Sequence, residues 1–252
     1  MPKELLPVVD KPLIQYAAEE AVEAGIDTLV FVTGRNKRAI EDHFDANPEL
    51  EGLLTRRGKA AQAAMVRDIL PRGVECIFVR QAEQLGLGHA VLCAERAVGR
   101  EPFAVLLADD FLTHDGPGTT RQLVSAFEAS GRAQLSVMEV PRADAGKYGM
   151  IIPGEAPNSV AGLTEKPDPA EAPSTRASIG RYLLTPDVFD TLRALPPARA
   201  ARYNSPTPLT FTPGAAPWRP SRSRAGASTT GPRRASSPPR STSTPAAAGQ
   251  ST

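Results

Sequence analysis

Apolar residues along this chain follow two alternating patterns, which predict helices and strands in turn. Residues 13–24 carry apolar side chains at helical spacing, Gly25 interrupts them, and residues 28–33 form a continuous, largely β-branched run. One face of a helix repeats about every 3.6 residues, whereas a strand buried on both sides is apolar throughout. The same alternation predicts further helices at 37–44, 53–70, 89–98 and 119–130, and strands at 74–79, 103–108 and 134–139.

The pattern changes after Pro141, where the predicted elements become shorter. Strands are expected at 149–152, 160–165 and 178–184, and a helix begins at Pro186. No flexible linker separates the two regions, so residues 1–197 are expected to form one continuous domain. Buried strands that alternate with helices favour a mostly parallel sheet with helices on both faces, which is a three-layer, Rossmann-like α/β fold.

The composition is that of an ordinary soluble protein, with 41% hydrophobic and 23% charged residues among 252. Two cysteines, Cys76 and Cys93, are too few for a disulfide framework or a zinc cluster. No apolar run approaches the roughly 20 residues of a membrane span, and no basic-then-apolar signal peptide opens the sequence. These features predict a cytoplasmic protein without membrane partners.

The charge balance changes abruptly after Pro197. Residues 1–197 contain 21 basic and 28 acidic side chains, whereas residues 198–252 contain eight Arg, nine Pro and no Asp, Glu or Lys. A segment so rich in Arg, Ser and Pro buries too little apolar surface to fold, so we expect residues 198–252 to be disordered. One interpretation is a basic arm for nucleic acid or acidic partners, and such a segment attracts polyanions without sequence specificity.

Polar clusters follow the predicted strands. Asp109 and Asp110 come directly after the strand at 103–108, at the edge where open α/β sheets bind ligands, and a carboxylate there suits Mg²⁺. The segment QAEQLGLGHA at 81–90 lies between a strand and a helix, where glycines admit close backbone approach and the helix N-terminus favours anions. Taken alone, a turn or a helix cap explains each cluster as well.

Several motifs occur in a fixed order: PKELLPVVDKPLIQY at 2–16, QAEQLGLGHA at 81–90, Asp109, Tyr148-Gly149, Glu165-Lys166-Pro167 and Gly180-Arg181-Tyr182. Together they resemble the sugar nucleotidyltransferase family, most closely the bacterial UTP:glucose-1-phosphate uridylyltransferases, also called UDP-glucose pyrophosphorylases. The resemblance implies a Mg²⁺-dependent transferase that converts UTP and α-D-glucose 1-phosphate to UDP-glucose and diphosphate by direct attack, without a covalent enzyme intermediate. It implies no specific nucleic-acid partner and is compatible with a homo-oligomer.

The resemblance also assigns roles by position. It places Lys3 and Lys166 as catalytic cations near the phosphates, and Asp109 as the ligand of Mg²⁺. The remaining roles are nucleotide binding by Gln81, Gly86 and Gly88, and sugar-phosphate binding by Gly149, Glu165 and Lys166. Two alternatives stay open: a thymidylyl- or cytidylyltransferase, and a noncatalytic remnant that binds a sugar nucleotide.

The sequence departs from the family pattern at both ends. The resemblance implies a first strand and a Gly-rich loop with an arginine ahead of Pro2, so the chain is expected to be truncated and impaired in turnover. After residue 197 the family continues with a sequence like GAGGEIQLTDA. A nucleotide sequence that encodes this stretch encodes ARAARYNSPTP, residues 198–208, when it is read one nucleotide later. We therefore interpret residues 198–252 as an out-of-frame tail.

Overall fold

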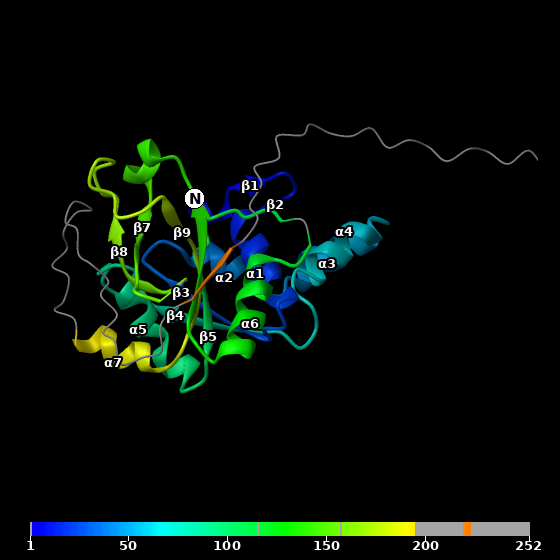
Figure 1. The fold of residues 1–252 in the computed structure, drawn as a ribbon. Helices are drawn as coiled ribbons and strands as arrows, with labels where there is room; N and C mark the ends of the chain where they lie inside the picture. Colours follow the sequence, from blue (N-terminus) through cyan, green and yellow to red (C-terminus); the bar gives the residue numbers. More distant parts are fainter. Residues whose placement is uncertain (1, 115, 157, 195–218, 223–252) are drawn as a thin grey trace, which may run out of the picture.

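The computed structural model describes residues 2–114, 116–156, 158–194 and 219–222 (Figure 1). It begins with a short 3₁₀ turn and two very short antiparallel strands: η1 (Lys3–Leu5), β1 (Pro7–Val8) and β2 (Lys11–Pro12). Helix α1 (Leu13–Glu23) follows, as the helical spacing at 13–24 predicts. Gly25, with a φ of 93°, comes just after it, in a backbone conformation that favours glycine.

Strands β3 (Thr28–Thr33) and β4 (Glu75–Arg80) form a parallel pair at the positions that the apolar runs predict. Parallel neighbours need a long crossover connection, which is helical here. Its helices are α2 (Arg38–Phe44), α3 (Pro48–Arg56) and α4 (Ala60–Arg67).

The prediction of a single helix at 53–70 is wrong. Helix α3 already begins at Pro48, because the side chain of Asn47 accepts a hydrogen bond from the backbone N–H of Leu50 and caps the helix. The helix then ends at Arg56, and Gly58 adopts a φ of 72°, a left-handed conformation that a helix cannot contain. Helix α4 is therefore a separate element.

Strand β9 (Arg176–Leu184) is the central strand of the larger sheet. It pairs antiparallel with β5 (Phe103–Leu106), β6 (Gln134–Glu139) and β7 (Gly149–Pro153). Two further strands complete this sheet: β8 (Val160–Glu165), antiparallel to β7, and β10 (Arg219–Arg222), parallel to β6.

The predicted α/β class is confirmed, and the pairing is mixed. Strands β3 and β4 are parallel, as are β6 and β10, but the pairs that β7 and β9 make are antiparallel. The mostly parallel sheet that the apolar runs predict is found in the β3–β4 pair and not among the strands around β9. Strands joined by short connections, such as β7 and β8, pair antiparallel because only antiparallel neighbours can be joined by a tight turn.

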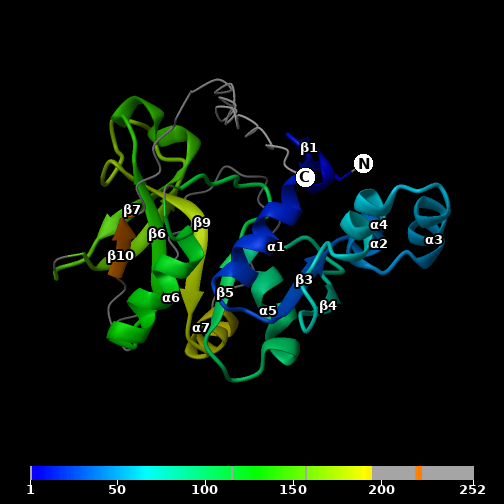
Figure 2. The same ribbon diagram turned by 90° about the vertical axis from the view of Figure 1, so that its right-hand side faces the viewer.

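Helices cover the strands on two sides, in the predicted three-layer arrangement (Figures 1 and 2). Helix α1 packs against α6 (Thr119–Ser130), and α5 (Leu87–Val98) packs against α7 (Asp187–Ala194). A 3₁₀ segment, η2 (Arg142–Lys147), precedes β7. No helix in the described part of the chain is long and apolar enough to cross a membrane.

The apolar core is divided into separate clusters. The largest lies between α5, α7 and the β9 sheet and includes Leu135, Ile151 and Phe189, which are at most 1% exposed. Another lies where α1 meets β3 and contains Ala18, Ala21 and Leu29. The β9 sheet and the β3–β4 pair therefore have distinct apolar cores.

The predicted disordered, out-of-frame tail at 198–252 falls almost entirely outside the described residues. The structure describes only 219–222 of it, as strand β10 beside β6. The reading frame of this segment remains a prediction.

Candidate active site

The carboxyl ends of β3, β4 and β5 meet at one edge of the fold. Gln81, which follows β4, donates its backbone N–H to the carbonyl oxygen of Thr33 at the end of β3, at 2.9 Å. Lys37 follows β3 and Asp109 follows β5. The turn η1 connects them, because its first two residues form ion pairs with these two side chains. Open α/β sheets bind their ligands at such an edge.

The first of these ion pairs joins two residues that the sequence analysis placed in the site. Lys3 Nζ donates to Oδ2 of Asp109 at 2.6 Å. This hydrogen bond lowers the pKa of Asp109; burial acts in the opposite direction, and the charges of Lys3 and Lys37 add to the lowering. Asp109 is therefore an ionised carboxylate at neutral pH. Both side chains are substantially exposed, so the pair is accessible to a charged ligand.

The second ion pair, between Glu4 and Lys37, was not predicted from the sequence. Glu4 is buried, and its Oε1 accepts a hydrogen bond from Nζ of Lys37. Its other oxygen, Oε2, is buried and has no hydrogen-bond partner among the described residues. A sequence signal for this pair was weak, because a Lys-Glu-Leu segment is ordinary on a surface and only the fold buries it.

Asp110 packs against a glycine of the neighbouring strand. A Cβ placed on Gly180 would lie 2.0 Å from Oδ2 of Asp110 and 3.0 Å from Cβ of Leu107. Burial raises the pKa of Asp110, and the negative charge of Asp109 raises it further. The two adjacent carboxyl groups thus differ: Asp109 faces the cation and Asp110 faces the backbone of β9.

Replacing Gly180 with alanine is expected to cost about 2–5 kcal/mol of unfolding free energy, from a left-handed backbone at about 1–2 and overpacking at about 1–3. The φ of Gly180 is 69°. Gly131 offers a matched control, since its φ is 63° and nothing lies within 4 Å of its Cβ position. Urea unfolding should show Gly131→Ala losing only the backbone part. Equal losses in both variants would contradict the close contact with Asp110.

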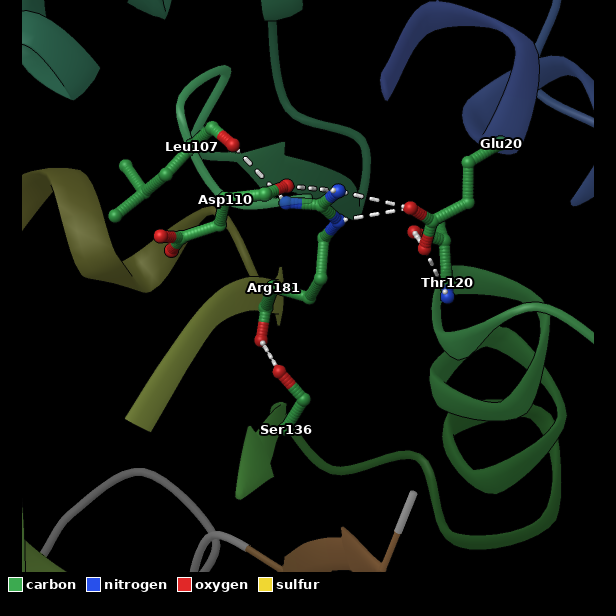
Figure 3. Close-up of polar contacts among 6 residues, drawn as sticks. All are labelled: Glu20, Leu107, Asp110, Thr120, Ser136 and Arg181. Carbon is green, nitrogen blue, oxygen red and sulfur yellow. Dashed lines mark hydrogen bonds and ion pairs between the residues drawn. The ribbon is translucent and has the colours of Figure 1, made fainter. Parts of the chain in front are cut away.

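A buried arginine holds the turn that carries the two aspartates (Figure 3). Arg181 is 2% exposed, and its Nε and Nη2 both donate to Oε2 of Glu20, at 3.0 and 2.9 Å. Its Nη1 donates to the carbonyl of Leu107 at 3.0 Å, and Nη2 to the carbonyl of Asp110 at 3.1 Å. The other oxygen of Glu20 accepts from the backbone N–H and the hydroxyl of Thr120, at 2.9 and 2.7 Å.

This network makes Arg181 a positioning residue. Gly180-Arg181-Tyr182 is one of the motifs that carry the family resemblance, but the guanidinium of Arg181 contacts protein carbonyl and carboxylate groups in the interior. An arginine within the otherwise mostly apolar strand β9 was a signal for a buried partner, because an isolated buried charge is very costly. The identity of that partner, Glu20, depends on the fold.

The Glu20 carboxylate makes stability depend on pH. Burial alone raises its pKa, but the hydrogen bonds and charge of Arg181, with those of Thr120, outweigh burial and leave the pKa lowered. As pH falls, the unfolded chain therefore binds a proton at Glu20 before the folded chain does. The stabilisation by Glu20 is fully present above about pH 4.3 and is lost as pH falls through the folded-state pKa. Asp110 has the opposite effect on the pH dependence of stability, because its raised pKa lets the folded state bind a proton before the unfolded state does.

We expect the pH dependence of unfolding below pH 5 to flatten when Glu20 and Arg181 are both replaced by methionine. Urea unfolding of wild type and double variant at several pH values between 7 and 3 measures this slope. Parallel losses in the two proteins would show that other carboxylates carry the acid sensitivity.

The predicted nucleotide-binding residues lie at the start of α5. Gln81 Nε2 donates to the carbonyl of Gly86 at 3.1 Å and lies 3.1 Å from Nδ1 of His89. Gly86 has a φ of 94°, which only glycine adopts readily. A Cβ on Gly88 would lie 2.9 Å from Cδ2 at the end of the Leu192 side chain, so Gly88 faces α7. The structure thus brings Gln81 and Gly86 together and places Gly88 against α7.

The predicted sugar-phosphate residues lie where β7 and β8 pair. Gly149 is the register partner of Glu165, and its Cβ position lies 3.1 Å from Oε2 of that residue. Lys166 has a φ of 44° and places its Nζ 3.8 Å from Oε1 of Glu165. Burial raises the pKa of Tyr182, and the charges of Asp110 and Glu165 raise it further. The structure therefore brings Gly149, Glu165 and Lys166 together at one end of this strand pair.

The described residues contain no group of three or more His, Cys, Asp or Glu that could hold a metal ion. Mg²⁺, however, keeps several waters and is often held by one or two carboxylates together with substrate phosphates. The ionised, partly exposed Asp109 fits such a role, whereas the half-buried Asp110, whose pKa is raised, fits it less well.

Comparison with known proteins gives consistent matches. Residues 1–204 match the nucleotidyl transferase family. The UTP–glucose-1-phosphate uridylyltransferase of Staphylococcus epidermidis is 47% identical over 195 residues, covering 76% of this chain and 67% of that protein. UTP–glucose-1-phosphate uridylyltransferase 1 of Staphylococcus saprophyticus is 46% identical over the same length and coverage.

Solved structures agree with the sequence matches. UDP-glucose pyrophosphorylase from Acinetobacter baumannii superposes with a TM-score of 0.78 at 34% identity, covering 90% of this chain and 80% of that one. The UTP-bound form of the enzyme from the same organism gives a TM-score of 0.77 at the same identity and coverage. The chain therefore belongs to the nucleotidyl transferase family.

Proposed function

We propose that this protein transfers a uridylyl group from UTP to α-D-glucose 1-phosphate, giving UDP-glucose and diphosphate. The Lys3–Asp109 contact at the carboxyl edge of β5 carries the proposal, since transfer between two polyanions needs cations and a metal-binding carboxylate together. The names of the similar uridylyltransferases and the UTP-bound pyrophosphorylase support the choice of substrates.

The reaction that we propose is a direct displacement. A phosphate oxygen of glucose 1-phosphate forms a bond to the α-phosphorus of UTP while the bond from that phosphorus to the bridging oxygen of the β-phosphate breaks, and diphosphate leaves. In this reaction Lys3 would neutralise the phosphates of UTP, and Lys166 would neutralise the phosphate of glucose 1-phosphate. Because positioning and charge supply the rate, no nucleophilic Ser or Cys is needed.

The remaining predicted residues are proposed to orient the two substrates. Gln81 and the backbone at Gly86 and Gly88 face the base, and the amide of Gln81 would exchange its bond to the Gly86 carbonyl for one to uracil. Glu165 would accept hydrogen bonds from sugar hydroxyls, and Gly149 allows the sugar to approach the backbone.

Asp109 is proposed to hold Mg²⁺ together with the phosphates of UTP. When bound, the ion would neutralise negative charge that develops on the phosphates during transfer. The contribution of the protein is to keep Asp109 ionised through Lys3 and to fix its turn through Arg181.

Diphosphate release in the presence of UTP, glucose 1-phosphate and Mg²⁺ tests the proposed activity. Parallel assays with dTTP and CTP separate the uridylyltransferase from the thymidylyl- and cytidylyltransferase alternatives. A rise in Tm with UDP-glucose but no diphosphate release would identify a noncatalytic sugar-nucleotide binder. If the protein shows neither stabilisation by UDP-glucose nor diphosphate release, both functions are refuted.

We also propose that residues 198–252 are read out of frame. The support is the coding relation between ARAARYNSPTP and GAGGEIQLTDA, and the loss of every acidic residue after Pro197. Nucleotide sequencing of the locus tests this proposal: if no single-nucleotide offset encodes a GEIQLTDA-like stretch at this point, the segment is a genuine basic arm.

A further inference from the structure

A short chain of polar contacts runs from the carbonyl of Gly86 through Gln81 and His89 to Cys93. Nε2 of Gln81 lies 3.1 Å from the carbonyl oxygen of Gly86 and also 3.1 Å from Nδ1 of His89. The other ring nitrogen of His89, Nε2, lies 3.9 Å from Sγ of Cys93, one turn further along α5. The half-buried imidazole of His89 thus contacts the side chain that we propose to face the base.

The carbonyl of Gly86 fixes which end of the Gln81 amide faces His89. A carbonyl oxygen only accepts, so the atom of Gln81 that contacts it belongs to the –NH₂ group. An amide nitrogen only donates, so Nδ1 of His89, which lies beside the same nitrogen, is an acceptor and carries no proton. In the neutral imidazole the proton is then on Nε2, which can donate to Sγ of Cys93, a weak acceptor.

The two hydrogen bonds of the Gln81 amide differ in what each acceptor loses when the bond breaks. The carbonyl of Gly86 also accepts the backbone N–H of Ala90 at 3.1 Å, so it keeps a partner when Gln81 leaves. Nδ1 of His89 accepts no second hydrogen bond from the described residues. An acceptor that is left without a partner costs free energy once a ligand excludes water. The bond to Gly86 is therefore the one that a base replaces, and the bond to His89 is kept.

We propose that His89 is a positioning residue that selects the pyrimidine by holding the Gln81 amide in one orientation. This inference rests on the proposed function, in which Gln81 binds the base. While Nδ1 of His89 holds the –NH₂ group, the amide presents its second N–H and its oxygen Oε1 side by side. Uracil offers the complementary pair, a carbonyl oxygen at C4 and an N–H at N3, and thymine offers the same pair. The held amide therefore matches both bases.

Cytosine presents the reverse pattern, with an amino group at C4 and an unprotonated N3. Gln81 can match it only when its amide turns over, which brings Oε1 in place of –NH₂ beside Nδ1 of His89. Two acceptors then face each other and the hydrogen bond between these side chains is lost. A site rejects a ligand strongly when binding leaves the polar groups of the site unpaired. His89 should therefore favour UTP and dTTP over CTP.

The protonated nitrogen of each histidine ring tests the first step of this inference. Nitrogen-15 NMR of the full chain at about pH 8, where an ordinary imidazole is neutral, distinguishes ring nitrogens with and without a proton. Nδ1 of His114 lies 2.6 Å from the carbonyl oxygen of Gly116 and must carry a proton, whereas Nε2 of His43 must donate to Oε1 of Gln15 at 3.1 Å. We expect His89 to resemble His43 and to differ from His114. A proton on Nδ1 of His89 would overturn the inference.

The ratio of the dissociation constants of CTP and UTP tests the selection itself. Calorimetry with Mg²⁺ and without sugar phosphate measures both constants for the full chain. His89→Leu removes the acceptor and should lower the preference for UTP about tenfold or more, mainly because CTP binds more tightly. A variant that is merely destabilised would bind both nucleotides less well. His89→Phe, which keeps a ring without a nitrogen, tests the same expectation if His89→Leu fails to fold.

Two further variants serve as controls for the change in preference. His89→Asn keeps an acceptor oxygen near the position of Nδ1 and should retain the preference for UTP. His43→Leu is a matched control, because His43 also binds a glutamine side chain but lies on α2, and it should leave the ratio unchanged. In every one of these proteins dTTP should follow UTP.

The possible outcomes separate this inference from the proposed function. An unchanged ratio in His89→Leu and His89→Phe, or a wild-type protein that binds UTP and CTP equally, would overturn the role of His89 even if uridylyl transfer is observed. A preference for UTP that both variants lose supports this role even if no diphosphate is released. A wild-type protein that binds neither nucleotide would overturn both proposals.

Discussion

Replacing Arg181 with methionine is expected to lower the free energy of unfolding by about 3–5 kcal/mol, because it leaves the buried Glu20 carboxylate without its cation. The side chain of Glu20 is 10% exposed and that of Arg181 only 2%. The carbonyl oxygens of Leu107 and Asp110 lose their donors as well. Urea unfolding at pH 7 measures the loss, and a drop below about 1 kcal/mol would show that the pair is not buried as described.

Arg193 provides a matched control for this substitution. Arg181 donates twice to the one carboxylate of Glu20, and Arg193 donates once to each of two carboxylates, Glu95 and Asp190, but the side chain of Arg193 is 49% exposed. Because solvent screens exposed ion pairs, Arg193→Met should lower the free energy of unfolding far less than Arg181→Met does. The contrast between two arginines with similar numbers of carboxylate contacts isolates the effect of burial.

The double variant Glu20→Met with Arg181→Met separates two parts of the loss. Replacing a whole buried ion pair by apolar side chains is often nearly neutral, so most of the charge penalty should disappear. The carbonyl oxygens of Leu107 and Asp110 still lack their donors, and each should leave a residual loss of about 1–3 kcal/mol in the free energy of unfolding. Full recovery in the double variant would show that Arg181 does not hold this turn.

Local elements of the fold were predictable because their signals lie within a few consecutive residues. The ranges of β3, α6 and β6 agree with the predicted ones, since apolar period and flanking glycines such as Gly131 determine them. The break between α3 and α4 was missed. An exposed helix tolerates an isolated glycine, so Gly58 alone did not distinguish a break from a continuous helix.

Pairings between distant residues could not be derived from local pattern. Strand β9 is apolar like a parallel strand, but its antiparallel neighbours β5, β6 and β7 come from different parts of the chain. Arg181 and Glu20 lie 161 residues apart, and no period connects them. Lys3 and Asp109, 106 residues apart, were placed in one site only because their motifs resemble those of a known family.

Replacing Asp109 with asparagine is expected to lower kcat/KM for diphosphate release by about 10²–10³-fold, the usual cost of losing one preorganised electrostatic group at a transferring phosphate. The change keeps the size of the side chain and removes the charge that pairs with Lys3 and that we propose holds Mg²⁺. Asp68→Asn is the control. A hydrogen-bonded cation lowers the pKa of both aspartates, Lys3 for Asp109 and Arg67 for Asp68, but Asp68 lies at the end of α4.

A magnesium titration decides which of the two roles of Asp109 matters. If the carboxylate holds the metal, Asp109→Asn should raise the Mg²⁺ concentration needed for half-maximal activity, and Lys3→Met should leave it nearly unchanged. If Asp109 only orients Lys3, the two variants should lose similar activity, the double variant should lose little more than either, and the Mg²⁺ requirement should stay the same. An unaltered kcat/KM in Asp109→Asn would remove this residue from the site, and the contact that carries the proposed function with it.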